Sequence, residues 1–164
     1  MHQSSYNLMR DGFIKKWLCP GCGSKLKIID IGSLDVNGSY RPLFDLPNWH
    51  YTGMDIKPGK NVDIVGWENI PVGEYDVLIS GQVWEHVKRP WDLLKKATAY
   101  IKPGGWICII VPHTCQEHRY PIDTYRYFPD GLRDLFEYAE INIVEVYRNP
   151  IPKTIDTIGI GTVK

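Results

Sequence analysis

The stretch Lys27-Ile28-Ile29-Asp30-Ile31-Gly32-Ser33 decides the fold class of this chain. It is a short apolar run that ends in an acidic residue and a glycine, which is typical of a buried strand closing in a tight turn. Two further segments follow a related pattern, His50 to Asp55 and Tyr75 to Ser80, because each is a largely apolar run that ends in a polar residue. Apolar strands that alternate with helices predict a mainly parallel sheet covered on both faces.

The remaining elements are predicted from the spacing of apolar residues. Helices are expected over Tyr6 to Leu18, Trp91 to Ile101 and Gly131 to Tyr138. Further strands are expected over Asn61 to Val65, Trp106 to Val111, Ile141 to Tyr147 and Ile155 to Val163. Lys102-Pro103-Gly104-Gly105 is predicted to be a turn that precedes a strand. The last two strands are candidates for an antiparallel pair.

Length and charge narrow the class of protein. The 164 residues suffice for one domain, predicted over 1–164, in which residues 1–23 form a lead-in helix and turn. Basic and acidic residues number 19 each, so no partner among nucleic acids or membranes is expected. The chain lacks an apolar run of roughly 20 residues and a secretion signal, which predicts a cytoplasmic protein. The oligomeric state stays open, with a homodimer as one possibility.

The cysteines offer half of a metal site. Cys19-Pro20-Gly21-Cys22 has the spacing of one zinc knuckle, but the second half is missing. Cys115 lies between His113 and His118 without knuckle spacing. A reduced turn rich in Gly and Pro is the favoured interpretation, and no metal is expected.

Residues that follow strands are the candidates for ligand binding. In an open parallel sheet, ligands bind outside the carboxyl ends of the strands. Gly32 lets a backbone approach a ligand closely, and the amides of its turn are expected to donate hydrogen bonds. Asp55 lies about twenty residues beyond the turn, where a carboxylate accepts both hydroxyls of a ribose. The alternative is a strand-ending turn with a helix-capping aspartate, since the three-glycine dinucleotide spacing is absent.

Five segments, taken together in their order along the chain, indicate one protein family more specifically than any one of them does alone. They are Ile28 to Ser33, Gly53 to Ile56, Tyr75 to Ser80, Trp84 to Val87 and Ile101 to Gly105. In order and spacing they resemble the motifs of class I S-adenosylmethionine-dependent methyltransferases. The run Asp35-Val36-Asn37-Gly38-Ser39 is similar to that of a glycan-associated subgroup of small, type 11-like enzymes. The resemblance implies an α/β fold, a Rossmann-like three-layer sandwich with a mainly parallel seven-stranded sheet and an antiparallel C-terminal strand.

The same resemblance implies S-adenosylmethionine as the cofactor and assigns its contacts. Asp30, Gly32 and Ser33 would face its methionine part, and Asp55 would hold the ribose with Ile56 beside the adenine. Ser80 and Gln82 would line the methyl-donor end. Relatives often carry an aspartate and a small residue after the third strand, where this chain has Gly66-Trp67-Glu68. Trp67 stacking on the adenine, Glu68 accepting from it, and a core tryptophan remain alternatives.

The acceptor side is predicted from the polar and aromatic run after the fifth strand. His118 to Arg126 is similar to a His-x-x-Pro-x-Asp-x-x-Arg segment of methyltransferases associated with sugars. A hydroxyl acceptor benefits from a base of near-neutral pKa, for which His118 is the first candidate and His113 the second. His86, Tyr120, Tyr125 and Arg126 are expected to bind the substrate. Each histidine has a structural alternative, such as bonding a carbonyl, and Arg126 has another, an internal ion pair with Asp123.

The predicted function is methyl transfer from S-adenosylmethionine to a small-molecule or glycan-type acceptor, at oxygen, chiefly by proximity and alignment. The alternative is a catalytically inactive module of the same fold that binds or scaffolds. A nicotinamide-dependent reductase is disfavoured, because the full glycine fingerprint is absent.

Overall fold

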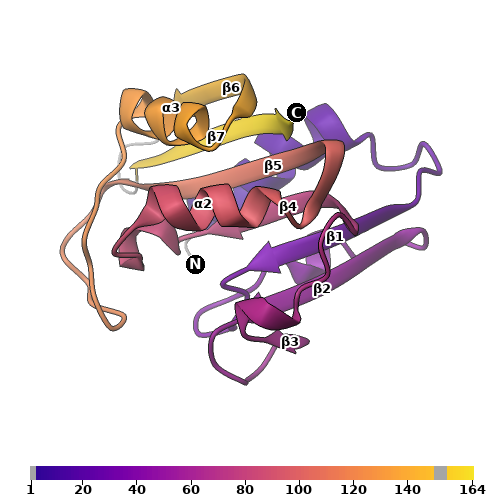
Figure 1. Ribbon diagram of the computed structural model, residues 1–164, viewed down its shortest axis with the longest axis horizontal. Helices are drawn as coiled ribbons and strands as arrows, with labels where there is room; N and C mark the ends of the chain where they lie inside the picture. Colours follow the sequence, from indigo (N-terminus) through magenta and orange to yellow (C-terminus); the bar gives the residue numbers. More distant parts are fainter. Residues whose placement is uncertain (1–2, 150–154) are drawn as a thin grey trace.

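The computed structural model describes residues 3–149 and 155–164, and within them seven strands form one sheet (Figure 1). The strands follow one another across the sheet in the order β3-β2-β1-β4-β5-β7-β6. Their bounds are β1 Leu26–Ile31, β2 Trp49–Asp55, β3 Ile64–Val65, β4 Tyr75–Gly81, β5 Ile101–Thr114, β6 Ile141–Arg148 and β7 Ile155–Val163.

The sheet is parallel except at β7, which pairs antiparallel with both β5 and β6. The predicted fold class and the antiparallel pairing of the last two strands are therefore confirmed. In the parallel part, Asp30 of β1 lies opposite Gly53 of β2 and Ile79 of β4. This register brings the carboxyl ends of the three strands to one edge, where ligands bind in such sheets.

Neighbouring residues of a strand point to opposite sides of the sheet, so the apolar strands make both faces apolar. Helices cover each of these faces. On one face Ile28, Val77 and Cys108 pack with the helical segments α1 (Gln3–Asn7) and η1 (Leu8–Leu18). On the other face Ile29, Leu78 and Ile107 belong to a core shared with α2 (Pro90–Thr98) and α3 (Pro129–Tyr138). In Figure 1 α2 and α3 lie on the viewer's side of the sheet.

Local sequence explains where α2 and α3 begin. Each has a proline in its first turn, whose fixed φ suits a helix start. Asp92 in α2 and Asp130 in α3 place a negative charge in that turn, which favours the positive end of the helix dipole.

One predicted turn is wrong. Lys102-Pro103-Gly104-Gly105 belongs to β5, which begins at Ile101 rather than Trp106. Tyr75 of β4 pairs with Ile101 and Val77 with Trp106, so the additional β5 residues form an irregularity in the register. Gly104 has a φ of 77°, a conformation that glycine adopts without a steric penalty.

Two other predictions differ from the structure in extent. The strand predicted from Asn61 is only Ile64–Val65, because Asn61 has a φ of 72° and its side chain donates to the carbonyl of Ser33. The first helical segment begins at Gln3, and its Leu8–Leu18 part is π-helical. Short 3₁₀ turns complete the chain: η2 Arg41–Leu43, η3 Trp67–Asn69 and η4 Trp84–His86.

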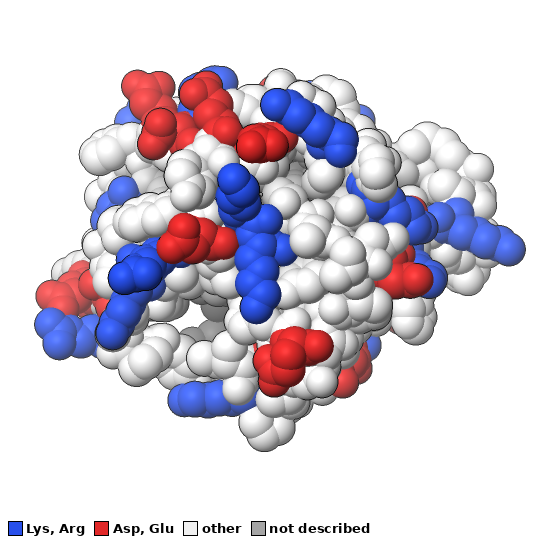
Figure 2. All heavy atoms as spheres, viewed as in Figure 1, with Lys and Arg blue, Asp and Glu red and all other residues white. Residues whose placement is uncertain are grey.

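The surface carries mixed charge. Figure 2 shows basic and acidic side chains interspersed on one face, in keeping with equal totals of the two kinds. Among the described residues, no helix combines the length and apolar character that a membrane span requires.

Candidate functional site

A cleft of about 760 Å³ lies at the carboxyl ends of β1, β2 and β4. Its volume is in the range of small-molecule sites. Most of the predicted site residues line it together: Asp30, Gly32, Ser33, Asp55, Ile56, Trp67, Gln82, His86, His118 and Tyr120. The two acidic strand ends at Asp30 and Asp55 thus open on one space, and the expected acceptor histidines His86 and His118 open on it too.

Asp30 forms the floor of this cleft and is buried. Its carboxylate accepts a hydrogen bond from the hydroxyl of Tyr51. Burial raises the pKa of Asp30 to about 7, while the Tyr51 hydroxyl and the Arg41 charge oppose the rise. Asp30 therefore exchanges a proton near neutral pH.

Asp55 is held by backbone amides on both oxygens. Its Oδ2 accepts from the amide of Leu34 at 3.2 Å, and its Oδ1 accepts from the amide of Lys57 at 3.2 Å. A carboxylate oxygen has two lone pairs, so each oxygen keeps acceptor capacity for a ligand hydroxyl. These contacts fix the orientation of a carboxylate that lines the cleft.

The glycine turn differs from the expectation in one respect. The amides of Gly32 and Ser33 both donate to the carbonyl of Met54, at 2.8 and 3.0 Å, so they are engaged within the protein. Gly32 has a φ of 78°, and a Cβ there would lie 2.2 Å from Cγ2 of Val83. The Ser33 hydroxyl donates to the carbonyl of Asn61 at 2.9 Å. The turn thus shapes the cleft by close approach, and these two amides do not serve a ligand.

Gln82 lines the cleft and carries a buried acceptor without a hydrogen-bond partner among the described residues. Its φ is 60°, and its Nε2 donates to Oδ1 of Asp156 at 3.1 Å. Its Oε1 is buried and has no hydrogen-bond partner among the residues that the structure describes. A buried acceptor of this kind is costly unless a donor such as an ammonium group reaches it.

Trp67 packs against the core and also lines the cleft. Its ring stacks on Tyr100, with centroids 6.3 Å apart and planes at 24°, and it also lines the cleft. Ile56 lines the cleft on the same side and is largely exposed. Glu68 is not among the residues that line the cleft.

His86 and His118 form the opposite wall. Their rings meet edge to face, with centroids 5.0 Å apart. Nδ1 of His86 lies 2.6 Å from the carbonyl oxygen of Ile122, and burial lowers the pKa of His86. His118 is 44 % exposed, and its Nδ1 lies 3.1 Å from the carbonyl oxygen of Gln116.

Glu85 lies behind these histidines and was not among the predicted site residues. Its side chain is fully buried in η4, with Oε1 3.6 Å from Nε2 of His86 and 3.9 Å from Nε2 of His118. Burial raises the pKa of Glu85 to about 8. Its position beside His86 within the Trp84 to Val87 motif was the only signal in the sequence, and the inward orientation depends on the η4 turn.

Comparison with known proteins identifies the fold family. A family model described as a methyltransferase domain matches residues 15–142. The chain belongs to the methyltransferase domain family. This methyltransferase family agrees with the one that the resemblance of its sequence motifs implied.

Solved structures share the fold over nearly the whole chain. One is the 1,6-didemethyltoxoflavin-N1-methyltransferase of Burkholderia thailandensis, with S-adenosylhomocysteine bound; it is 17% identical, with a TM-score of 0.70, over 98% of this chain and 85% of that one. A second is an S-adenosylmethionine-dependent methyltransferase of Aquifex aeolicus, 17% identical, with a TM-score of 0.67, over 99% of this chain and 100% of that one. A third is YcgJ of Bacillus subtilis, 12% identical, with a TM-score of 0.70, over 99% of both chains. A search of curated proteins found no match.

The cleft of the methyltransferase fits the cofactor by its chemistry. Asp55 would offer a carboxylate to a ribose, Gln82 an amide to the methyl-donor end, and Trp67 an aromatic surface to the base. These three groups open on the same cleft and differ in the kind of atom that each would bind.

Ser80 does not line the cleft of the methyltransferase, contrary to its expected place at the methyl-donor end. Its side chain is fully buried, and its hydroxyl donates to the carbonyl of Ile31 at 2.8 Å. Ser80 thus ties β4 to β1 and has no access to a ligand.

Three residues expected on the acceptor side also lie outside the cleft lining of the methyltransferase. His113 packs edge to face on Phe128 at 4.6 Å, with its Nδ1 2.7 Å from the Thr114 hydroxyl. The Tyr125 hydroxyl donates to the carbonyl of Lys88 at 3.0 Å. Arg126, the third, makes contacts within its own loop.

Arg126 and Asp123 form the internal ion pair that the sequence left as an alternative. Both guanidinium amino groups of Arg126 donate to the carboxylate of Asp123, at 2.6 and 2.7 Å. The pair lowers the pKa of Asp123 and raises that of Arg126. The amide of His118 also donates to Asp123 at 2.6 Å, so the ion pair positions His118.

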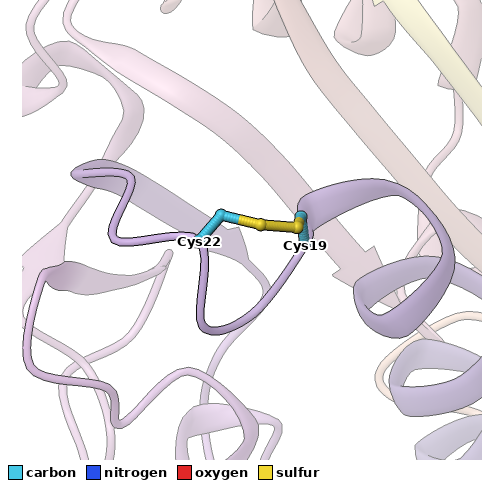
Figure 3. Close-up of a disulfide and its surroundings, with 2 residues drawn as sticks. All are labelled: Cys19 and Cys22. Carbon is cyan, nitrogen blue, oxygen red and sulfur yellow. A yellow bond between two sulfur atoms is a disulfide. The ribbon is translucent and has the colours of Figure 1, made fainter.

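Cys19 and Cys22 are joined by a disulfide in the turn between η1 and β1 (Figure 3). The sequence favoured a reduced turn. The amide of Cys22 donates to the carbonyl of Cys19 at 3.1 Å, and this tight turn brings the Cα atoms to 5.8 Å, within the range that a disulfide bridges.

Proposed function

We propose that this methyltransferase transfers the methyl group to a hydroxyl oxygen of a small-molecule or glycan-type acceptor. The observation that carries the proposal is that His86 and His118 line the same cleft as Asp30 and Asp55. A cofactor bound at the acidic strand ends would thus have imidazoles beside it. Alignment of acceptor and methyl group within one cleft is the main source of rate in such a reaction.

In this proposal Asp55 accepts the ribose hydroxyls, while Ile56 and Trp67 flank the adenine. Gln82 accepts from the amino group of the methionine part, and Asp30 lies nearby. When bound, S-adenosylmethionine supplies an already activated methyl group, so the chain need only orient the acceptor and exclude competing water. This assignment is supported by the unsatisfied Oε1 of Gln82 and by the free acceptor capacity of Asp55.

His118 is the proposed base for a hydroxyl acceptor. It lines the cleft, is partly exposed, and is positioned by Asp123 through its backbone amide. Tyr120 and Arg119 line the cleft next to it and provide hydrogen-bonding groups for a polar acceptor. His113, the second candidate, is a weaker proposal because it packs on Phe128 outside the cleft lining.

We prefer oxygen to nitrogen or carbon as the methylated atom for two reasons. Polar side chains line the cleft around His118, and the segment that begins at His118 resembles one in methyltransferases associated with sugars. Fold-related proteins include an N1-methyltransferase and a carbon methyltransferase, so the fold itself leaves the atom undecided. The balanced charge supports the further proposal that the enzyme works in the cytoplasm without nucleic-acid or membrane partners.

The test is a turnover screen with labelled S-adenosylmethionine against sugar nucleotides, small phenols and amine analogues of each. We expect methyl incorporation into hydroxylated acceptors and none into their deoxy counterparts. Calorimetric titration with the cofactor is measured in parallel. Transfer to the amines alone would contradict the oxygen assignment, and cofactor binding without any transfer would favour an inactive binding module.

A further inference from the structure

Three side chains lie close together near the part of the cleft proposed for the methyl acceptor. Each of them turns a possible metal-ligand atom toward the other two. One ligand atom each from Glu85, His86 and His118 lies within 4.8 Å of the other two. Neither carboxylate oxygen of Glu85 has a hydrogen-bond partner within residues 3–149 and 155–164, although the side chain is fully buried. Leaving a carboxylate buried without a donor or cation is strongly unfavourable.

The hydrogen bonds of the two imidazoles determine which nitrogens face Glu85. A backbone carbonyl can only accept, so Nδ1 of His86 must donate to Ile122 and Nδ1 of His118 must donate to Gln116. In a neutral imidazole the other nitrogen, Nε2, then carries a lone pair. Both Nε2 atoms are the ones nearest to Oε1 of Glu85, at 3.6 and 3.9 Å. When Glu85 is ionised, three electron-rich atoms therefore face one another with no hydrogen between them.

This arrangement has the form of a metal site. Zn²⁺ holds imidazole nitrogen and carboxylate oxygen at about 2.0–2.2 Å, so two ligands in tetrahedral geometry lie about 3.4 Å apart. The two separations from Glu85 to the histidines, 3.6 and 3.9 Å, are close to that value, and all three ligand atoms lie within 4.8 Å of one another. Metal-bound histidines commonly donate their other ring nitrogen to a backbone carbonyl, as His86 and His118 do here.

We propose that Glu85, His86 and His118 bind a divalent cation that takes mixed nitrogen and oxygen ligands, with Zn²⁺ as the probe of choice. His86 and His118 line the cleft, so the remaining coordination positions face the space in which an acceptor would lie. Two imidazoles and one carboxylate leave such positions open in catalytic metal sites. The site goes beyond the methyltransferase activity and departs from the expectation, drawn from the cysteines, that the chain holds no metal.

The competing arrangement is a protonated Glu85 that donates to one of the imidazoles. This protonated arrangement would also remove the repulsion between the lone pairs. In it, His118 keeps the role of base. With a metal bound, Nε2 of His118 is a ligand and is not available as a proton acceptor, so the base role proposed for His118 belongs to the metal-free chain. The two arrangements are therefore exclusive, and metal binding distinguishes them without any measurement of turnover.

The experiment measures Zn²⁺ binding to the full chain by calorimetry and by elemental analysis after dialysis. Cys19→Ser/Cys22→Ser serves as the parent, because reduction of this disulfide, which lies outside the cleft lining, would free two thiols as competing ligands. We expect one Zn²⁺ per chain in the parent, and an affinity weaker by roughly tenfold or more in Glu85→Gln and in His118→Ala. His50→Ala, at an exposed histidine in β2, is the matched control and should bind as the parent does.

Thermal unfolding provides an independent readout. Added Zn²⁺ should raise the Tm of the parent and of the His50 variant, since a ligand that binds only the folded state stabilises it. Glu85→Gln should fold without metal, because it removes a buried acid, and its Tm should not respond to Zn²⁺. The proposal is overturned if the parent takes up no Zn²⁺ at millimolar concentration, or if the Glu85 and His118 variants bind it as tightly as the parent does.

Discussion

The backbone amide of Leu34 donates a hydrogen bond of 3.2 Å to the carboxylate of Asp55, which joins the turn after β1 to the end of β2. Both residues line the cleft, so this contact fixes one part of its wall. Asp55 reaches the cleft with its orientation already set, so little side-chain entropy is lost when a ligand binds.

Asp55→Ala is expected to weaken S-adenosylmethionine binding by more than roughly tenfold, because charge-assisted hydrogen bonds to the ribose are lost. Calorimetric titration measures the effect. Asp92→Ala removes an exposed carboxylate in α2 and should leave the affinity unchanged. An unaltered affinity of the Asp55 variant would show that another group holds the ribose.

Asp30 is expected to make stability depend on pH. Its pKa is about 7 when folded and about 4 when unfolded, so the folded state binds more protons between these values. The free energy of unfolding should therefore fall as pH rises from about 4 to about 7, by at most about 1.4 kcal/mol per pH unit. The groups that influence Asp30 are Tyr51, Arg41 and Asp55.

Denaturant unfolding of Asp30→Asn across this pH range provides the check. The amide cannot ionise but can still accept from Tyr51, so the variant should lose this part of the pH dependence. Subtracting the two curves isolates Asp30 from other titrating groups. Parallel curves for the two proteins would mean that Asp30 is ionised in the fold at all these pH values.

His118→Ala is expected to lower kcat on the accepted substrate by roughly 10²-fold or more while leaving cofactor affinity intact. The reason is that His118 lines the cleft from the segment after β5, whereas the proposed ribose acceptor Asp55 ends β2. His50→Ala is the control for both measurements. A combined loss of turnover and of cofactor affinity would instead indicate a structural histidine.

Gly32→Ala is expected to destabilise the fold by about 1–3 kcal/mol, because its φ is 78° and the added Cβ would lie 2.2 Å from Cγ2 of Val83. Gly131→Ala is the matched control. Nothing lies within 4 Å of its added Cβ in α3, so that change should stabilise the protein by about 0.5–1 kcal/mol. Equal unfolding midpoints for the two variants would contradict this account of the turn.

Val83→Ala in the Gly32→Ala background separates the two causes. Removing the Val83 methyl groups relieves the steric overlap but leaves the backbone strain, so a partial recovery of stability is expected. Complete recovery would assign the whole effect to the contact with Val83.

The sequence by itself determined the strand pattern and the residues at the strand ends. Apolar runs that end in Asp30, Asp55 and Ser80 are a local signal, since side-chain burial in a parallel sheet is repeated at every position of the strand. The order of these runs along the chain was enough to indicate the family. The convergence of Asp30 and Asp55 followed from the parallel register, because equivalent strand ends meet at one edge.

Only the tertiary structure decided which of these polar groups are available to a ligand. Ser80 and the Gly32 amide satisfy carbonyls on neighbouring strands, Arg126 satisfies Asp123, and Glu85 is buried against histidines. Whether a group is buried or has a hydrogen-bond partner depends on segments far apart in the chain. The local spacing of residues therefore does not predict it. The sequence therefore predicted the edge of the sheet that binds, whereas the three-dimensional packing determined which atoms there remain free to act.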